Sequence, residues 1–199
     1  MSELKIFNRW DTTAIKVEDP GLIDYINLRA IVVPRTGGRN VGTQFWKSKS
    51  HIVERFINKI MVSGHKGKKH KISSGRNAGK ATTTYQIVED TFALIERKLS
   101  KNPIEVFVKA VENAAPREEI TTIEYGGARY PKAVECAPQR RVDYALRLIT
   151  QGSFQASFGK KKSIVEALAD EIMKAYNLDQ SSTAISKKLE LERQSDASR

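Results

Sequence analysis

The sequence is poor in the residues that build metal and redox sites. Its 199 residues include one cysteine, Cys136, and three histidines, His51, His65 and His70. A single cysteine excludes an internal disulfide framework, and three scattered histidines do not form a zinc-binding pattern. We therefore expect no metal site and no cofactor, and we interpret Cys136 as a small packed residue.

Long hydrophobic runs are also missing. The longest apolar stretch that could suggest a membrane segment is only "AIVV" at residues 30–33, whereas a membrane-spanning helix needs about 20 apolar residues. The first residues, "MSELKIF", lack the basic start, apolar stretch and cleavage site of a secretory signal. We expect a soluble cytoplasmic protein that does not contact membranes.

Catalytic motifs are equally scarce. The stretch "SGRNAGKAT" resembles a phosphate-binding P-loop, but three residues separate Gly75 from Gly79 where the motif needs four. Ala81 also follows Lys80 where a magnesium-binding Ser or Thr should stand. The histidines have no obvious carboxylate partner, and the Glu118-Glu119 pair fits a solvated surface. We expect no enzymatic activity, and the broken motif predicts no nucleotide hydrolysis.

Positive charge is abundant and concentrated in one segment. The chain carries a net charge of +11 and has a sequence pI of about 9.7. Residues 47–80 hold ten basic residues and one acid, whereas residues 1–46 and 81–199 are each within one charge of neutrality. A block of this strength in a chain otherwise near balance indicates a polyanionic partner.

Apolar periodicity predicts a mainly helical protein. Residues 52–61, 85–99, 103–113, 138–151 and 163–176 each carry an apolar stripe at helical spacing, with Asn102 as a cap before Pro103. The tail beyond residue 181 has capping residues and charge pairs but little apolar surface, so we expect a surface helix that frays. Residues 1–48 show weak periodicity and one short helix at most, at 21–27.

Around Gly126 and Gly127 the spacing of apolar residues changes from the helical pattern to the alternating pattern of β-strands, which indicates a β-hairpin. These glycines separate two runs rich in β-branched and aromatic residues, and a two-residue turn needs positive φ at both positions. In that register Glu124 faces Arg129 and Ile123 faces Tyr130. Because a lone ribbon is marginally stable, it must rest on the helices at its base while its tip projects.

The predicted fold is therefore a helical bundle of about five to six helices with a protruding two-stranded β-hairpin and an irregular N-terminal extension. Its expected parts are the extension at residues 1–48 and a helical nucleic-acid-binding domain at 49–199. A basic insert occupies 65–80, and the hairpin occupies 120–135.

Several basic residues outside the insert share a face or a helix end. Arg140 and Arg147 are seven residues apart on one helix, and Lys160, Lys161 and Lys162 precede another helix, whose positive N-terminus attracts phosphate. A merely solvated face explains the arginines equally well. Likewise, Tyr130 can stack on nucleotides or simply pack on its own ribbon.

A second motif near the insert is weaker. Residues 64–67 match the GXXG loop of KH domains, but no second helix follows directly. We favour a helix C-cap at Gly64 and a flexible loop position at Gly67.

The order of three segments carries a family resemblance. "VERFINKIMVSG", "AVENAAPREEITTIEYGGARYPKAVECAPQRRVDYALRLI" and "GKKKSIVEALADEIMKAY" together resemble the universal small-subunit ribosomal protein seven family, over residues 49–199. The extension at 1–48 and the widened basic insert make the chain similar to the archaeal and eukaryotic branch.

The resemblance implies a structural constituent of the small ribosomal subunit that binds small-subunit rRNA, nucleates head assembly and touches neighbouring ribosomal proteins. It also implies a hairpin near the exit-site tRNA and the mRNA path. Its tip would be Tyr125, Gly126, Gly127, Ala128, Arg129 and Tyr130, and Arg140, Arg141 and Lys160 to Lys162 would face rRNA. The first hairpin strand, "EEITTIE", is more acidic than the bacterial form, which weakens the case for phosphate contacts along it.

Charge alone extends the expected RNA contacts to further residues. The expected rRNA-binding set is Lys47, Lys49, Lys66, Lys68, Lys69, Lys71, Arg76, Lys80, Arg117, Arg140, Arg141, Arg147, Lys160, Lys161 and Lys162. We expect the insert to be an RNA-anchoring loop that orders when phosphates neutralise its like charges. The alternative is a sequence-specific DNA-binding helical protein, which would bind duplex DNA as a dimer on paired half-sites.

Overall fold

The structure is a computed structural model that describes residues 4–64 and 77–199. Most of the predicted basic insert, residues 65–76, lies outside the described residues. Within them, no helix is long and apolar enough to cross a membrane.

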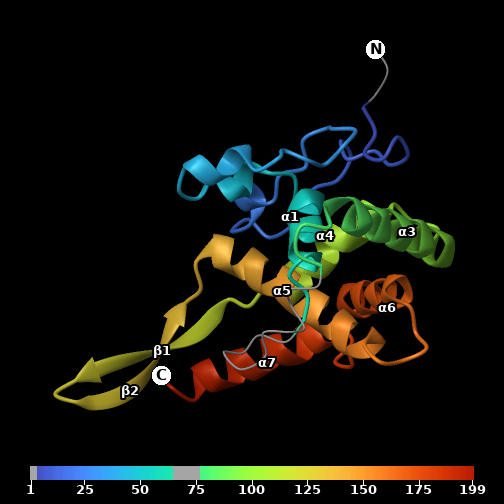
Figure 1. Ribbon diagram of the computed structural model, residues 1–199. Coiled ribbons are helices and arrows are strands. Elements are labelled where there is room, and N and C mark those ends of the chain that lie inside the picture. The colour runs from blue at the N-terminus through green and yellow to red at the C-terminus, as the bar shows by residue number, and fades with distance from the viewer. Residues whose placement is uncertain (1–3, 65–76) are drawn as a thin grey trace.

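The described residues form a helical bundle with one β-hairpin, which confirms the predicted fold class (Figure 1). Helix α6 packs mainly against α3, α4 and α5, and α1 packs on α3 and α5. The helices are α1 (Ile52–Ile60), α3 (Ala81–Leu99), α4 (Pro103–Ala114), α5 (Pro138–Ser157), α6 (Ile164–Tyr176) and α7 (Thr183–Asp196).

Helix α4 illustrates how the sequence sets an element's boundary. The Asn102 side chain accepts a hydrogen bond from the Ile104 N–H at 3.0 Å, and Pro103 occupies the first turn. Because proline lacks the N–H that the first turn leaves unpaired, this start is favourable. Phe107 on the apolar face lies 4.7 Å from Phe56 and 5.7 Å from Phe92, ring centre to ring centre, so α4 joins the core of α1 and α3.

Helix α5 is longer than predicted because Gly152 does not end it. The helix continues to Ser157, six residues beyond the expected end near residue 151. A Cβ placed on Gly152 would lie 2.8 Å from Cβ and Oγ1 of Thr183, the first residue of α7. Gly152 therefore permits a close approach of α5 and α7 inside a continuous helix.

The N-terminal segment lacks long elements yet contributes to the core. It contains three 3-10 turns, η1 (Ile23–Tyr25), η2 (Arg39–Gly42) and η3 (Trp46–Lys49), so the short helix expected at 21–27 is a single turn. Phe7 and Trp10 are buried and make edge-on contacts with Phe92 at 6.3 and 5.9 Å. Figure 1 shows this segment lying across the end of the bundle where α1 begins.

Buried charged residues of the helices hold this segment in place. The carboxylate of Glu112 accepts a hydrogen bond from the Glu18 N–H at 2.7 Å, and Glu54 accepts from the N–H and hydroxyl of Thr36 at 2.8 and 2.6 Å. Hydrogen bonds to ionised groups are stronger than neutral ones. Backbone N–H groups of the N-terminal segment thus find acceptors in these carboxylates, although the segment forms no long helix or strand there.

The hairpin consists of β1 (Glu118–Tyr125) and β2 (Ala128–Glu135), paired antiparallel. Its register sets Glu124 opposite Arg129 and Ile123 opposite Tyr130, as predicted. Both turn glycines have positive φ, 58° at Gly126 and 83° at Gly127. Figure 1 shows the ribbon extending well away from the bundle.

Helix α7 supports the base of this ribbon. It packs against β1 and α5, buries Ala184 and Ile185, and remains helical to Asp196. Beyond it, Arg199 forms an ion pair with Glu118 at the start of β1. The predicted surface helix therefore has a structural task, because a two-stranded ribbon needs packing at its base.

Candidate RNA-binding surface

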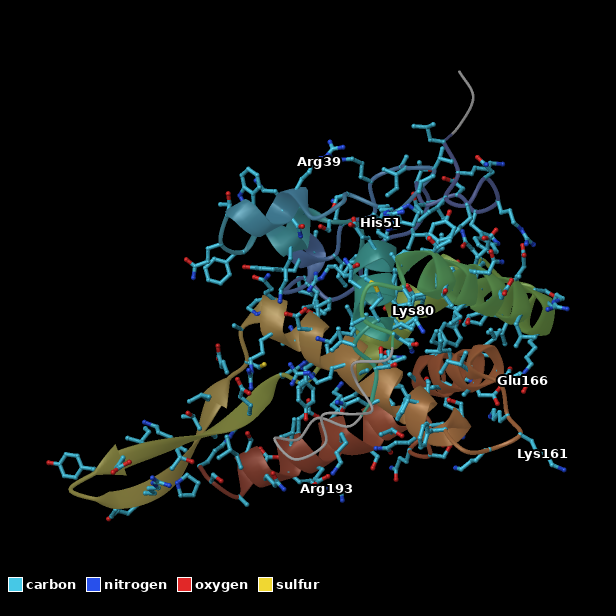
Figure 2. The ribbon with its side chains drawn as sticks, in the orientation of Figure 1. Arg39, His51, Lys80, Lys161, Glu166 and Arg193 are labelled. Atoms are coloured by element: carbon cyan, nitrogen blue, oxygen red, sulfur yellow. The ribbon has the colours of Figure 1, made fainter. Side chains whose placement is uncertain are left out.

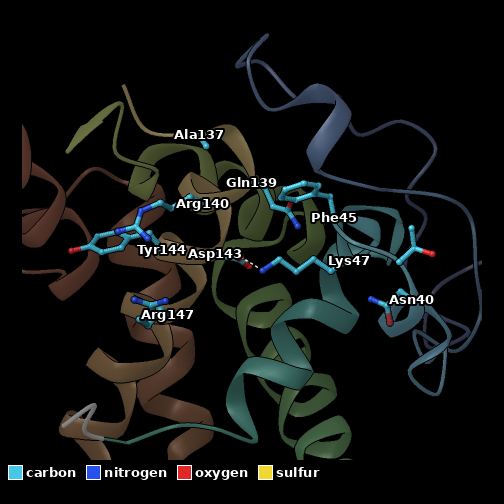
Figure 3. Close-up of a pocket in the computed structure, with 10 residues that line it drawn as sticks. Asn40, Phe45, Lys47, Ala137, Gln139, Arg140, Asp143, Tyr144 and Arg147 are labelled. Atoms are coloured by element: carbon cyan, nitrogen blue, oxygen red, sulfur yellow. Dashed lines mark hydrogen bonds and ion pairs between the residues drawn. The ribbon is translucent and has the colours of Figure 1, made fainter. Parts of the chain in front are cut away.

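Residues far apart in the sequence line one open pocket of about 550 Å³ (Figure 3). One wall is the start of α5, and the other is the backbone around η2 and η3. Figure 3 shows Arg140, Tyr144 and Arg147 on the α5 side, across from Phe45 and Lys47. The full lining is Asn40, Thr43, Phe45, Lys47, Ala137, Gln139, Arg140, Asp143, Tyr144 and Arg147.

Asp143 at the floor of the pocket fixes the two walls together. It forms ion pairs with Lys47 of η3 and, at 3.1 Å, with the buried Arg55 of α1, whose guanidinium also donates to the Tyr25 carbonyl at 2.8 Å. Burial opposes ionisation of Asp143, but the hydrogen bond from Lys47 and the charges of Arg55 and Lys47 outweigh it and lower its pKa. The carboxylate is therefore charged at neutral pH and locally neutralised.

The cations of the pocket differ in whether an acidic side chain already binds them. Arg140 donates to Glu119 of β1 at 2.7 Å, and Lys47 is held by Asp143. Within the described part of the chain no acceptor is found for Arg147. Burial raises the pKa of Tyr144, which lies one turn away, so its hydroxyl stays protonated. An unpaired guanidinium beside a phenol suits recognition of a phosphate.

Arg141 is placed differently from its neighbour Arg140. Its side chain is only 10% exposed, pairs with Asp19 at 2.6 Å and donates to the Pro116 carbonyl at 3.0 Å. These partners tie the N-terminal segment and the base of β1 to α5. The geometry favours a structural task for Arg141 over contact with RNA.

The three lysines before α6 are mainly exposed. Lys161 points away from the bundle (Figure 2), and Lys160 is also exposed, whereas Lys162 pairs with Asp170. Ser163 and Glu166 form a capping box at the start of α6, at 3.2 and 3.3 Å. Because these side chains occupy N–H groups of the first turn, Lys160 and Lys161 carry the attraction for phosphate there more than the helix end does.

The remaining predicted basic residues are dispersed. Lys49 covers the ring of Trp46 at 4.2 Å, Lys80 is exposed at the start of α3 (Figure 2), and Arg117 is exposed just before β1. The structure therefore brings only some of the predicted cations together. Lys66, Lys68, Lys69, Lys71 and Arg76, with residues 65–67 of the GXXG match, lie outside the described residues.

The hairpin tip presents aromatic rings to solvent. Tyr125 is 81% and Tyr130 58% exposed, so Tyr130 does not pack into a core. Arg129 lies 3.5 Å from Glu124 across the ribbon, and Gly126 and Gly127 leave the turn free of side chains. Exposed rings beside a guanidinium suit stacking on nucleotides.

Sequence reasoning missed the polar and aromatic part of the pocket. Tyr144 could have been found, because it falls between Arg140 and Arg147 at helical spacing. Phe45 gives no such signal, since it lies in irregular backbone with a positive φ of 64°. Cys136 was interpreted correctly as a packed residue, and burial raises the pKa of its thiol to about 11.

No group of three potential metal ligands is found among residues 4–64 and 77–199. The chemistry that this surface offers is that of its cations, aromatic rings and amides. Such a surface suits a polyanion with flat, stackable groups.

Comparison with known proteins gives one consistent result. The sequence model of the family described as ribosomal protein S7p/S5e matches residues 32–199. A small ribosomal subunit protein uS7 from Nanoarchaeum equitans is 53% identical over 99% of this chain and all of its own length. The protein of the same name from Methanosphaera stadtmanae is 51% identical over 95% of each chain, and that from Methanothrix thermoacetophila 45% over 98% of this chain.

Proposed function

The chain belongs to the ribosomal protein S7p/S5e family, and on this premise we propose how it serves as a structural constituent of the small ribosomal subunit. Its high similarity to archaeal relatives agrees with the branch expected from its sequence. The protein binds small-subunit rRNA and neighbouring ribosomal proteins, works in the cytoplasm, and needs no catalytic activity or cofactor.

One observation carries the rRNA-binding proposal: Lys47, Arg140 and Arg147 converge on one open pocket. Lys47 lies near the end of the N-terminal segment, and Arg140 and Arg147 lie about a hundred positions later. Their side chains share this site even though residues 81–199 are almost neutral overall. Local clustering of cations, more than total charge, selects where phosphates bind.

A second basic site at the other end of α5 supports a part in assembly. Lys160 and Lys161 follow the end of α5, while Arg140 lies in its first turn. A helix of 20 residues is about 30 Å long, so two RNA segments can be held on one rigid rod. A protein that fixes the spacing of two segments favours the folded RNA, and we assign it nucleation of the subunit head on this basis.

The projecting hairpin supports a position near the exit-site tRNA and the mRNA path. Its tip points away from the bundle and carries Tyr125, Arg129 and Tyr130, which are all exposed. Two of the three acidic residues of β1, Glu118 and Glu119, lie at its base and pair with Arg199 and Arg140, and the third, Glu124, pairs across the ribbon with Arg129. Arginines of the same chain therefore neutralise these glutamates, and the acidic charge of β1 does not oppose an RNA contact at the tip.

Binding of the purified protein to small-subunit rRNA tests the proposal. We expect tight binding that falls steeply with salt concentration, and much weaker binding to unrelated RNA of equal length. Arg147→Gln should weaken the complex, whereas Lys187→Gln, at an exposed cation paired with Glu190 on α7, should not. Preferential binding to duplex DNA would contradict the proposal and favour a DNA-binding protein.

A further inference from the structure

We propose that the pocket between η3 and α5 receives a single unpaired nucleotide, whose base stacks on Phe45 and whose phosphate binds Arg147. This inference rests on the proposed rRNA binding and adds the class of ligand at that site. It distinguishes one extruded base from the phosphates of a continuous duplex.

Phe45 offers an open aromatic face. Its side chain is 68% exposed, and within the described residues no ring or cation is found stacked on it. The next residue, Trp46, is different because Lys49 already covers its ring at 4.2 Å. Phe45 precedes η3 with a φ of 64°, a conformation that a bulky residue adopts at a cost. An exposed ring gains stability when a base stacks on it.

Arg147 provides the matching cation. Arg140 is engaged by Glu119 and Lys47 by Asp143, so Arg147 is the pocket guanidinium whose donors stay free among the described residues. Three cations and one carboxylate line the site, and that carboxylate is shared by Lys47 and Arg55. The pocket therefore favours an anionic ligand over a cationic side chain of a partner protein.

The size and polar groups of the pocket fit a nucleotide. Its volume of about 550 Å³ lies within the range of small-ligand sites. The Asn40 amide donates to Ser50 at 3.0 Å, and among residues 4–64 and 77–199 neither its carbonyl oxygen nor the amide of Gln139 has a hydrogen-bond partner. Amides can pair with the edge of an extruded base, whereas the edges of paired bases are not accessible in this way.

The test uses two RNA hairpins that differ by one nucleotide. One carries a single bulged 2-aminopurine, and the other carries 2-aminopurine in a base pair. Stacking on an aromatic ring quenches the fluorescence of the bulged probe. The full-length protein is compared with Phe45→Leu, Phe45→Trp and Arg147→Gln. Phe158→Leu is the control, because Phe158 is an exposed ring at the opposite end of α5.

We expect the wild-type protein to quench the bulged probe and to bind it more tightly than the paired probe. Phe45→Leu should lose the quenching and at least about fivefold of the affinity for the bulged probe, with no change for the paired one. Phe45→Trp should retain both, and Phe158→Leu should behave as wild type. Arg147→Gln should weaken binding to both probes and reduce the salt slope by about one.

Three results would overturn the inference. They are no quenching by the wild-type protein, equal affinity of the wild-type protein for both probes, or quenching and affinity of Phe45→Leu equal to those of the wild type. The last would mean that the base does not stack on Phe45, since leucine keeps an apolar surface without the ring. Sedimentation separates these results from failure of the proposed function. Phe45→Leu should still enter small subunits, whereas absence of the wild-type protein from them would contradict ribosomal membership itself.

Discussion

The guanidinium of Arg141 donates a hydrogen bond to the carboxylate of Asp19 at 2.6 Å, across 122 positions of sequence. Burial opposes ionisation of Asp19, yet the hydrogen bonds from Arg141 and the Gly21 N–H, with the charges of Arg141 and Arg117, lower its pKa. The pair therefore stays ionised at neutral pH and fastens the N-terminal segment to α5.

Replacing Arg141 should affect stability more than RNA binding. Arg141→Gln leaves the partly buried carboxylate of Asp19 without its ionic partner, so we expect a loss on the order of 2 kcal/mol in the free energy of unfolding. Urea unfolding of the isolated protein measures it. The neighbouring Arg140→Gln removes an exposed pair and should cost about 1 kcal/mol or less. An Arg141→Gln protein of normal stability with lost RNA affinity would reverse this assignment.

His51 should make the folded protein sensitive to mild acid. Burial lowers the pKa of His51 from 6.5 to about 4, and its Nδ1 accepts a hydrogen bond from the Val53 N–H at 3.2 Å. Between these pH values the unfolded chain binds a proton that the folded one does not. Stability therefore falls as the pH drops from 6.5 to 4, by about 3 kcal/mol in total.

Thermal unfolding across this pH range measures the effect, with His51→Asn as the control. Asparagine keeps an oxygen to cap α1 but does not titrate. The lowered pKa values of Asp19, Asp143 and Asp170 confine their contribution to still lower pH. A wild-type curve parallel to that of His51→Asn would show that His51 is not the responsible group.

Gly152 should resist substitution even though it lies inside a helix. Alanine is the better helix former, but its Cβ would lie 2.8 Å from Cβ and Oγ1 of Thr183. We expect Gly152→Ala to destabilise the protein by about 1–3 kcal/mol through overpacking. Gly42→Ala is the control, because nothing lies within 4 Å of the added carbon. Equal stability of both variants in urea would mean that α5 and α7 separate easily.

The basic insert at 65–80 should contribute to the salt dependence of rRNA binding. Replacing Lys66, Lys68, Lys69 and Lys71 by alanine removes four charges available to phosphates. The slope of log affinity against log salt should become shallower by about three. Substituting four exposed lysines elsewhere, at positions 5, 16, 174 and 187, provides a charge-matched control. An unchanged slope in the insert variant would refute the anchoring hypothesis.

The hairpin tip should act on tRNA without affecting the fold. Tyr125→Ala and Arg129→Ala alter exposed side chains, so we expect unchanged unfolding and unchanged affinity for rRNA. In reconstituted small subunits, crosslinking of exit-site tRNA to the protein should fall. Tyr144→Ala, in the pocket, should lower the affinity for rRNA and leave the crosslinking of exit-site tRNA to the protein unchanged. Loss of rRNA binding in the tip variants would place the hairpin against rRNA instead.

The sequence predicts the elements better than their assembly. Helical spacing and the Asn102 cap indicate α4, and the two glycines at 126 and 127 specify the hairpin register. These signals are local. Phe7 and Trp10 pack on Phe92 from irregular backbone, whose hydrogen bonds, such as that from the Phe7 N–H to the Val32 carbonyl at 2.9 Å, no periodic pattern reveals.

The candidate site shows the same division. The charge pattern singled out Lys47, Arg140 and Arg147, because cations attract phosphate wherever they stand. It could not separate Arg141 from Arg140, although one is buried and the other exposed. That difference arises from Asp19, which reaches α5 only through the folded N-terminal segment.

Crosslinking the protein to RNA in its native cells and sequencing the attached fragments tests the central claim most directly. We predict that the fragments concentrate in one compact region of small-subunit rRNA, with a minor signal from tRNA, and that the main sites map to peptides containing Lys47 and Arg147. Fragments scattered over unrelated transcripts, or none above background, would contradict the account.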